Sequence, residues 1–280
     1  MPKNPFGIRN GKPIVISDLT EDERGLKCNS VCPQCNGKLE AKMGNIKVHH
    51  FAHTKDDCDE TLAVTKGLFM LIEHMINNGR TFYAPPLVIS YMANYLTEPV
   101  TINDFKDVIE IKSKVNSSND YELIKGNSFD VKGIELRTNS KNRVEALVVT
   151  SSSDRQLAIR ILPPPNICKV EKLLPFENFS TLICNASDIN FYENKSYDII
   201  NILKNHDRWY WLNNHKIEDF SNKIVDDINE SWRKFENARK TKFMNTLRVC
   251  ILCGEIKKTS EFAVRFPGRQ PKGKCKECLH

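Results

Sequence analysis

The sequence lacks the features that mark a membrane or secreted protein. It has no run of about 18 or more apolar residues, so no transmembrane helix is expected. Its first residues, Met1-Pro2-Lys3-Asn4-Pro5, contain no apolar signal-peptide core. It also lacks a Walker-type glycine loop, a Gly-x-Ser-x-Gly motif and a dinucleotide-binding fingerprint. These absences exclude several enzyme classes and predict a cytoplasmic protein without a membrane partner.

Cysteine, in contrast, is abundant, with ten residues, six of which stand in Cys-x-x-Cys pairs. In a chain of 280 residues with no signal sequence, this spacing favours metal binding in a reducing compartment over disulfides. Cys28, Cys168 and Cys184 are not needed as ligands, and we expect them to be buried or partly buried thiols.

The first candidate metal site lies near the N-terminus. Cys32-Pro33-Gln34-Cys35 is followed by His49-His50-Phe51-Ala52-His53 and by Cys58. Two thiolates from one tight turn can meet Zn²⁺ at tetrahedral angles, and a second ligand pair completes the shell. The predicted Cys₃His set is Cys32, Cys35, His53 and Cys58, with His50 as the substitute if Cys58 is not a ligand.

The second candidate site is at the C-terminus, where Cys250, Cys253, Cys275 and Cys278 predict a Cys₄ ribbon with 21 residues between its knuckles. We therefore expect two structural zinc ions as cofactors. The hairpin between the knuckles carries cations and an aromatic ring, which suit backbone phosphates and a stacked base. The candidate nucleic-acid-binding residues are Arg265, Phe266, Arg269, Lys272 and Lys274. Docking of a protein partner is the alternative role of this ribbon.

Positive charge is concentrated at the C-terminal end. Residues 233–280 contain 13 Lys and Arg against 4 Glu, a net charge of +9, whereas the whole chain carries +6. The remaining residues therefore carry a net charge of −3. A basic block on a near-neutral body attracts phosphate backbones, because each neutralised phosphate releases counterions. The alternative interpretation is a solvated, lysine-rich tail.

The hydrophobic patterns indicate a mixture of helices and strands. Apolar residues recur at three- and four-residue spacing from Glu60 to Asn78, which predicts a helix ended by Asn77-Asn78-Gly79. A longer helix is predicted over about 217–246, with an apolar stripe that packs on the body of the protein. Strands are predicted at Lys12–Ile16, on both sides of Gly44 within 37–48, and at Leu87–Tyr91, Val108–Val115, Ser128–Arg137, Arg143–Thr150, Gln156–Leu162 and Thr181–Cys184.

These elements predict four parts. Residues 1–58 form a leading strand and the N-terminal zinc ribbon, and residues 59–215 form an α/β core. Residues 216–248 form the long amphipathic helix, and residues 249–280 form the C-terminal Cys₄ ribbon. The aromatic run Trp209-Tyr210-Trp211 is expected to be a strand that packs on the long helix.

The order of the N-terminal motifs resembles the competence protein CoiA family. The resemblance rests on the Cys-Pro-x-Cys knuckle, the hairpin, His50-Phe51-Ala52-His53, Cys58, and a helix that opens at Glu60 and contains Lys66. It covers about residues 28–165 and implies an α+β fold with a PD-(D/E)xK nuclease-like, mixed-sheet core. Together with the cysteine motifs, this places small zinc ribbons at both ends of the core. The resemblance also implies a role with incoming or foreign DNA, in competence or on a mobile element.

The resemblance further implies the catalytic candidates Glu60, Lys66, Glu135 and Glu145, with Glu145 standing where the family has an aspartate. Such nucleases hold Mg²⁺ between carboxylates at the ends of adjacent strands, where the ion activates a water. Mg²⁺ is therefore the further cofactor expected if the core is active. Ordinary exposed strand residues are the alternative interpretation of Glu135 and Glu145.

The core motif departs from the family at three positions. Arg160 occupies the position of the second acid, Leu162 that of the lysine or glutamine, and Leu62 that of a helical histidine. An arginine at a metal position repels Mg²⁺. Three hypotheses follow. The first is a zinc-containing nucleic-acid-binding protein with a nuclease-like core that does not cleave. The second is an active Mg²⁺-dependent nuclease that uses Glu60, Glu135, Glu145 and Asp154. The third is a zinc-organised adaptor that docks on a protein partner.

Overall fold

A computed structural model describes residues 3–54, 58–91, 99, 101–106, 109–112, 114–116, 120–166, 173–244, 246–262, 273 and 275–279. The chain forms two compact units. The first unit contains Met1–Tyr91 and Ile109–Glu218, and the second contains Met92–Val108 and Asp219–His280. The four-part division expected from the sequence remains a prediction.

The core of the first unit is a six-stranded mixed sheet with the order β13-β12-β11-β10-β9-β5. Only the β11–β12 pair is parallel among these neighbours, and the other pairs are antiparallel. The strands from β9 to β12 cover the predicted runs to within one or two residues. The bounds are β5 Thr81–Ala84, β9 Asn127–Thr138, β10 Val144–Ser151, β11 Gln156–Leu162, β12 Thr181–Asn185 and β13 Trp209–Asn213. The prediction of an α+β fold with a mixed sheet is therefore confirmed.

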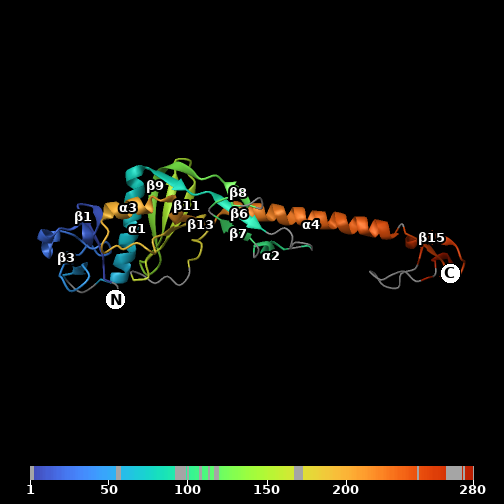
Figure 1. Cartoon of the computed structure of the whole chain (residues 1–280), viewed down its shortest axis with the longest axis horizontal. Coiled ribbons are helices and arrows are strands. Elements are labelled where there is room, and N and C mark those ends of the chain that lie inside the picture. The colour runs from blue at the N-terminus through green and yellow to red at the C-terminus, as the bar shows by residue number, and fades with distance from the viewer. Residues whose placement is uncertain are drawn as a thin grey trace. The chain divides into compact units, whose positions relative to one another are not determined.

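The sheet has two different faces, because side chains alternate along each strand. On β10, Leu147 and Val149 belong to the main core, which also contains apolar residues of α1 (Glu60–Gly79) and α3 (Ser196–Leu203). α1 packs against β5, β9 and β10, and α3 packs beside α1 (Figure 1). Ala146 and Val148 belong to a smaller cluster on the other face, together with Phe176.

Helix α1 begins at Glu60, as the sequence predicted. Asp59 is the N-cap, and its carboxylate accepts hydrogen bonds from the amides of Thr61 (2.8 Å) and Leu62 (3.3 Å). The predicted end was slightly early, because Gly79 is still helical and Arg80 takes the left-handed conformation with φ 50°. A left-handed residue after the last turn closes the helix, since its amide donates to the Ile76 carbonyl.

The aromatic run forms the strand β13, as predicted, and Ile217 of the long helix is packed against the same core. Trp209 and Trp211 are buried in the main core of the first unit, together with residues of α1. Their indole nitrogens donate to the Leu203 carbonyl (2.7 Å) and the Pro85 carbonyl (3.0 Å), respectively. Residues 181–213 thus complete the core sheet, because β12 and β13 both belong to it.

Several smaller elements surround this core. The leading strand is one half of a hairpin that the sequence only partly indicated, because its partner β1 was missed. A second, three-stranded sheet has the order β7-β6-β8. The bounds are β1 Phe6–Arg9, β2 Lys12–Val15, β6 Leu87–Tyr91, β7 Ile109–Lys112 and β8 Asp120–Ile124.

The N-terminal ribbon contains β3 (Leu39–Lys42) and β4 (His50–His53), which pair antiparallel. The sequence placed the second strand between Gly44 and Val48, and this was wrong. The strand begins at His50 because the fully buried ring of Phe51 anchors it opposite Ala41. The side chain of Ile46 is instead 96% exposed.

The second unit contains the short helix α2 (Ile102–Lys106), most of helix α4 (His215–Met244), and the strands β14 (Leu247–Val249) and β15 (Ile256–Lys258). The long helix therefore begins two residues earlier than predicted and ends two residues earlier. No helix within the described part of the chain is long and apolar enough to cross a membrane.

Candidate metal centres and the core motif

The N-terminal knuckle is a tight turn that aims two thiols at one point. The Cys32 amide donates to the Gly37 carbonyl (2.8 Å), and the Asn36 amide donates back to the Cys32 carbonyl (3.0 Å). The amides of Gln34 and Gly37 donate to the sulfurs of Cys32 (3.3 Å) and Cys35 (3.4 Å). Backbone donors of this kind stabilise thiolate over thiol.

The four predicted ligand atoms of this site meet. The Cys32, Cys35 and Cys58 sulfurs and a His53 ring nitrogen all lie within 4.8 Å of one another. A tetrahedral Zn²⁺ with bonds of about 2.3 Å to sulfur and 2.0 Å to nitrogen separates S from S by about 3.8 Å and S from N by about 3.5 Å. The Cys32–Cys58 sulfur distance is 3.7 Å, and Cys35 Sγ lies 3.5 Å from His53 Nε2. These residues fit zinc.

The histidine that was held as a substitute ligand lies outside this group. His50 Nδ1 is 2.9 Å from the Val48 carbonyl. His50 and His53 are the two ends of β4, and His53 is opposite Leu39 in the register while His50 is opposite Lys42. The structure therefore gathers the Cys₃His set with Cys58 rather than the set with His50.

Two of the three thiols of the first site resist ionisation when no cation is bound. Burial raises the pKa of Cys32, and burial and neighbouring thiols raise the pKa of Cys58. Burial also opposes ionisation of Cys35, but hydrogen bonds from the Gly37 amide and the Cys58 and Cys32 thiols lower the pKa of Cys35 overall. Three thiolates in one place repel one another, and a divalent ion removes that repulsion.

The C-terminal knuckle repeats the same turn. The Cys250 amide donates to the Glu255 carbonyl (2.9 Å), and the Gly254 amide donates to the Cys250 carbonyl (2.9 Å). The sulfurs of Cys250, Cys253, Cys275 and Cys278 lie within 4.8 Å of one another. The Cys253–Cys275 sulfur distance of 4.0 Å is close to the tetrahedral edge of about 3.8 Å. This donor set fits a closed, structural Zn²⁺ site.

The four thiols of the second site differ in acidity. Hydrogen bonds from the amides of Cys253, Cys275 and Leu252 lower the pKa of Cys250 to about 6. The thiols of Cys275 and Cys253, in contrast, raise the pKa of Cys278 to about 12. Cys250 therefore forms a thiolate readily, whereas a bound metal would favour the ionisation of Cys278.

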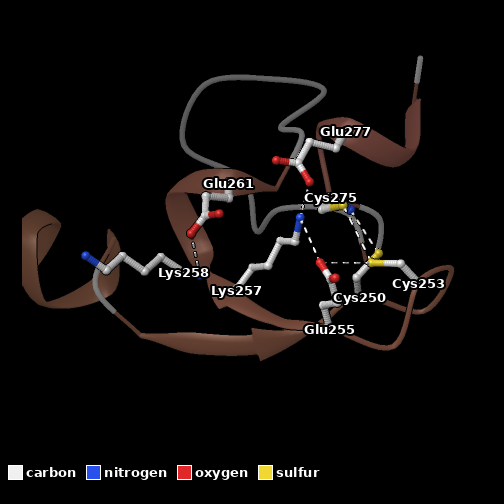
Figure 2. A network of polar contacts seen from close by, with 8 residues as sticks. All are labelled: Cys250, Cys253, Glu255, Lys257, Lys258, Glu261, Cys275 and Glu277. Carbon is white, nitrogen blue, oxygen red and sulfur yellow. Dashed lines mark hydrogen bonds and ion pairs between the residues drawn. The ribbon is translucent and has the colours of Figure 1, made fainter.

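An ion-pair network centred on Lys257 lies beside the second site, and the sequence did not predict it. The Lys257 ammonium lies between the carboxylates of Glu255 (3.1 Å) and Glu277, and the Glu255 carboxylate also lies 4.0 Å from Cys253 Sγ (Figure 2). The Lys257 side chain is only 11% exposed. Hydrogen bonds that the ammonium donates to Glu277 and Glu255 raise the pKa of Lys257. Lys257 therefore ties the first half of the ribbon to Glu277, between Cys275 and Cys278. No local sequence signal predicts this pairing, because the two residues are 20 positions apart.

The acidic residues of the core do not gather. Glu135 on β9 is opposite Val148, on the face away from α1, and pairs with Arg137 (3.0 Å). Glu145 lies at an irregularity in the β9–β10 pairing and accepts a hydrogen bond from Asn139 (3.0 Å). Asp154 pairs with Lys132 (2.5 Å). Within the described residues, only the two cysteine clusters bring three or more metal-binding side chains together.

The other two catalytic candidates are on helix α1, which packs on the opposite face of the sheet from Glu135. Glu60 is the first residue of that helix and lies close enough to Tyr192 to help raise the pKa of that phenol, after burial. Lys66 is half-buried in the second turn of α1. The catalytic role of all four candidates remains a prediction, and a Mg²⁺ site built from them has no support in this arrangement.

Arg160 occupies the position at which the family motif has its second acidic residue. Its Nη1 donates to the Leu174 carbonyl (2.8 Å), and its Nε is buried without a hydrogen-bond partner among the described residues. Burial lowers its pKa, while Glu145 raises it and Arg143 lowers it further. The guanidinium therefore lies near Glu145, where it competes with any cation for that carboxylate.

The candidate nucleic-acid-binding residues Arg265, Phe266, Arg269, Lys272 and Lys274 lie outside the described residues. Their role remains a prediction. The same holds for Cys168, whereas Cys28 and Cys184 are buried free thiols as expected.

Comparison with known proteins agrees with the N-terminal motif. Residues 19–60 match the family described as "Competence protein CoiA, N-terminal domain". This segment contains all four ligands of the first metal site and ends at Glu60. No curated protein and no solved structure matches the chain.

Proposed function

We propose that this protein binds DNA and acts in the handling of incoming or foreign DNA. The proposal starts from its CoiA-like N-terminal domain, which fits a competence-related role. In this proposal the two cysteine clusters each hold a structural zinc ion. The core serves as a nuclease-like scaffold that holds nucleic acid without cleaving it.

The observation that carries the proposal is the combination of the CoiA-like domain with a strongly basic C-terminal end. The net charge of +9 over residues 233–280 suits a polyanion, and a zinc ribbon is an ordered frame on which such charges can be placed. The hairpin between Cys253 and Cys275 would contact phosphates through Arg265, Arg269, Lys272 and Lys274 and stack a base on Phe266.

The core supports binding over cleavage. A metal-dependent nuclease needs carboxylates converging on one ion. Here Glu135 and Asp154 are neutralised by basic neighbours, and Arg160 lies near Glu145. The alternative of an active Mg²⁺-dependent nuclease requires these ion pairs to rearrange when DNA binds.

Salt dependence tests the proposal. If the four cations each neutralise one phosphate, the affinity for random-sequence DNA should fall by about 100-fold between 50 and 200 mM salt. Replacing Arg265, Arg269, Lys272 and Lys274 with Ala should remove most of that dependence, a change of about 3.6 in the slope of log affinity against log salt.

The matched control replaces four exposed lysines of the first unit, Lys125, Lys141, Lys204 and Lys216, with Ala. Both variants lose four positive charges, so a purely global charge effect would weaken DNA binding equally in both. Equal loss in the two variants, or no loss in the ribbon variant, would remove the C-terminal ribbon from the proposal.

A further inference from the structure

The C-terminal ribbon carries a concentrated set of exposed apolar side chains. Fourteen large hydrophobic residues are exposed in the described part of the chain, and five of them fall within the ten positions 247–256. Each is 55–70% exposed. They are Leu247, Val249, Ile251, Leu252 and Ile256. Apolar residues scattered singly on a surface need no explanation, but a cluster of this kind marks an interaction site.

The strand register places three of these residues on one face. Leu247 and Val249 are two apart on β14, and Val249 is directly opposite Ile256 on β15. Residues two apart on a strand and residues opposite each other in the register share a face. Ile251 and Leu252 continue from the end of β14 as the two middle residues of the knuckle. The N-terminal knuckle, in contrast, has Pro33 and Gln34 at these positions.

The opposite face of the same two strands carries charged residues next to the metal site. Arg248 and Lys257 are opposite each other in the register, and Lys257 is held by Glu255 and Glu277 beside the thiols (Figure 2). The metal site and its ion-pair network are therefore on one side of the hairpin, and Leu247, Val249 and Ile256 are on the other. This apolar face is not needed to hold the metal.

The edge of strand β14 that faces away from β15 has backbone groups that can accept another strand. The hydrogen bonds from the Thr259 amide to the Thr246 carbonyl and from the Cys250 amide to the Glu255 carbonyl fix which groups point toward β15. By alternation, the backbone groups of Leu247 and Val249 point away from β15. Among the described residues, no third strand pairs with β14. An extended segment can therefore add to this edge through main-chain hydrogen bonds.

The positive charge near this face favours a binding segment with acidic residues. Lys258 is opposite Leu247 in the register, on the apolar face, and its side chain is exposed and directed away from the thiols (Figure 2). The sequence segment that contains the ribbon, residues 233–280, carries a net charge of +9. An apolar segment with acidic flanking residues is complementary to both features.

A second copy of the chain is a poorer match. A stable dimer buries about 800 Å² on each partner and uses about 20–30 residues a side. Five side chains and a three-residue strand suit a short peptide segment instead. A second copy would also bring one +9 block against another.

We propose that the apolar face of the C-terminal ribbon, formed by Leu247, Val249 and Ile256 and continued by the exposed knuckle residues Ile251 and Leu252, docks an extended apolar segment with acidic flanks from a partner protein. The segment pairs with the edge of β14, its apolar side chains cover the face, and its acidic flank meets Lys258. This docking does not depend on DNA binding.

The test uses the zinc-loaded full chain to select from a phage-displayed library of random 12-residue peptides. Selected peptides are made synthetically, and their affinity is measured by fluorescence anisotropy. We expect alternating apolar sequences with Asp or Glu at one end. Their affinity should fall at least tenfold in the triple variant Val249→Thr, Leu252→Gln, Ile256→Thr. The control Ile46→Thr, an equally conservative change at an exposed isoleucine of the other ribbon, should leave affinity unchanged.

A charge reversal gives the sharper result. Lys258→Glu should shift the preference of the same library from acidic to basic flanks. Zinc content and DNA affinity are measured in parallel, and both should be unchanged in the triple variant. If that variant loses a zinc ion, the single variant Leu252→Gln supplies the comparison.

Three outcomes would overturn the proposal. Peptides without acidic flanks, or peptides that bind the triple variant as well as the original chain, would show that this face is not the docking site. A dimer in sedimentation that the triple variant converts to monomer would assign the face to a second copy. Loss of DNA affinity in the triple variant with no selected peptides would assign it to nucleic acid.

Discussion

Asn36 and Gly254 occupy the same position in two knuckles that share no other sequence beyond their cysteines. Each follows the second cysteine of its Cys-x-x-Cys pair, and each has a left-handed backbone, with φ 57° and 73°. Each amide donates to the carbonyl of the first cysteine, at 3.0 Å and 2.9 Å. The metal-binding turn therefore needs a residue that tolerates positive φ, which is why asparagine and glycine stand there.

This relationship predicts that Gly254→Asn is tolerated and Gly254→Val is not. No atom lies within 4 Å of a Cβ placed on Gly254, so the penalty for valine comes from the backbone conformation and not from a clash. A left-handed residue with a side chain costs about 1–2 kcal/mol, which corresponds to roughly tenfold weaker zinc binding. Competition with a chelator measures this affinity. Equal zinc affinity in both variants would contradict the explanation.

Zinc content should follow the two clusters independently. We expect two zinc ions per chain, one in Cys35→Ser, one in Cys253→Ser and none in the double variant, because a Cys-to-Ser change removes a ligand from a closed four-ligand site. Elemental analysis of the purified variants gives the count. Two ions retained in either single variant would show that the substituted cysteine is not a ligand.

Close packing of α1 on the leading hairpin makes Gly67 sensitive to substitution. A Cβ on Gly67 would lie 2.5 Å from Cβ of Phe6, which is itself fully buried. Gly67→Ala should therefore destabilise the fold by about 1–3 kcal/mol through overpacking, against a gain of ~1 kcal/mol in helix propensity. Gly79→Ala in the same helix is the control, because its nearest neighbour would be Thr81 Oγ1 at 3.8 Å. Urea denaturation gives both free energies of unfolding.

The ion pair of Asp188 with Arg208 should make stability depend on acid pH. Two hydrogen bonds, 2.6 and 3.0 Å long, join them, and Arg208 lowers the pKa of Asp188 below its usual 3.8. A lowered folded-state pKa stabilises the fold above the unfolded-state value and loses that effect as pH falls through the folded value. The Asp188 side chain is largely exposed, so Asp188→Asn should cost only about 0.5 kcal/mol at neutral pH.

The difference in stability between the original chain and Asp188→Asn should be constant from pH 5 to 8. It should shrink as the pH falls below 4, because the Asp188 carboxylate becomes protonated. Thermal unfolding of the two proteins over this range measures it. A difference that grows as the pH falls would have the wrong sign for this ion pair.

Local patterns predicted more of this protein than long-range ones. The candidate ligands of both metal sites could be identified because each Cys-x-x-Cys pair is fixed by one turn. Helix α1 could be identified because its apolar residues recur at three- and four-residue spacing. The position of β4 was missed because the burial of Phe51, not alternation around Gly44, sets its start. The separation of Glu60 from Glu135 depends on which face of the sheet each element meets, and no local signal reports this.

The interactions of the C-terminal ribbon show the same limit. Lys257 and Glu277 are far apart in sequence, so their pairing could not be distinguished from ordinary surface charge. The basic composition of the region pointed only to phosphate. The register of β14 and β15 separates its charged face from an apolar one, and that separation requires the pairing of the strands.

The most direct test of the central claim, a nuclease-like core that holds DNA without cutting it, is a cleavage assay on single- and double-stranded DNA with Mg²⁺ or Mn²⁺. Glu145→Ala is the control. We predict that DNA binds, that two zinc ions remain in each chain, and that neither protein cleaves. Cleavage by the original chain that is lost in Glu145→Ala would contradict the claim, because it would show that the acidic residues converge on a metal when DNA is bound.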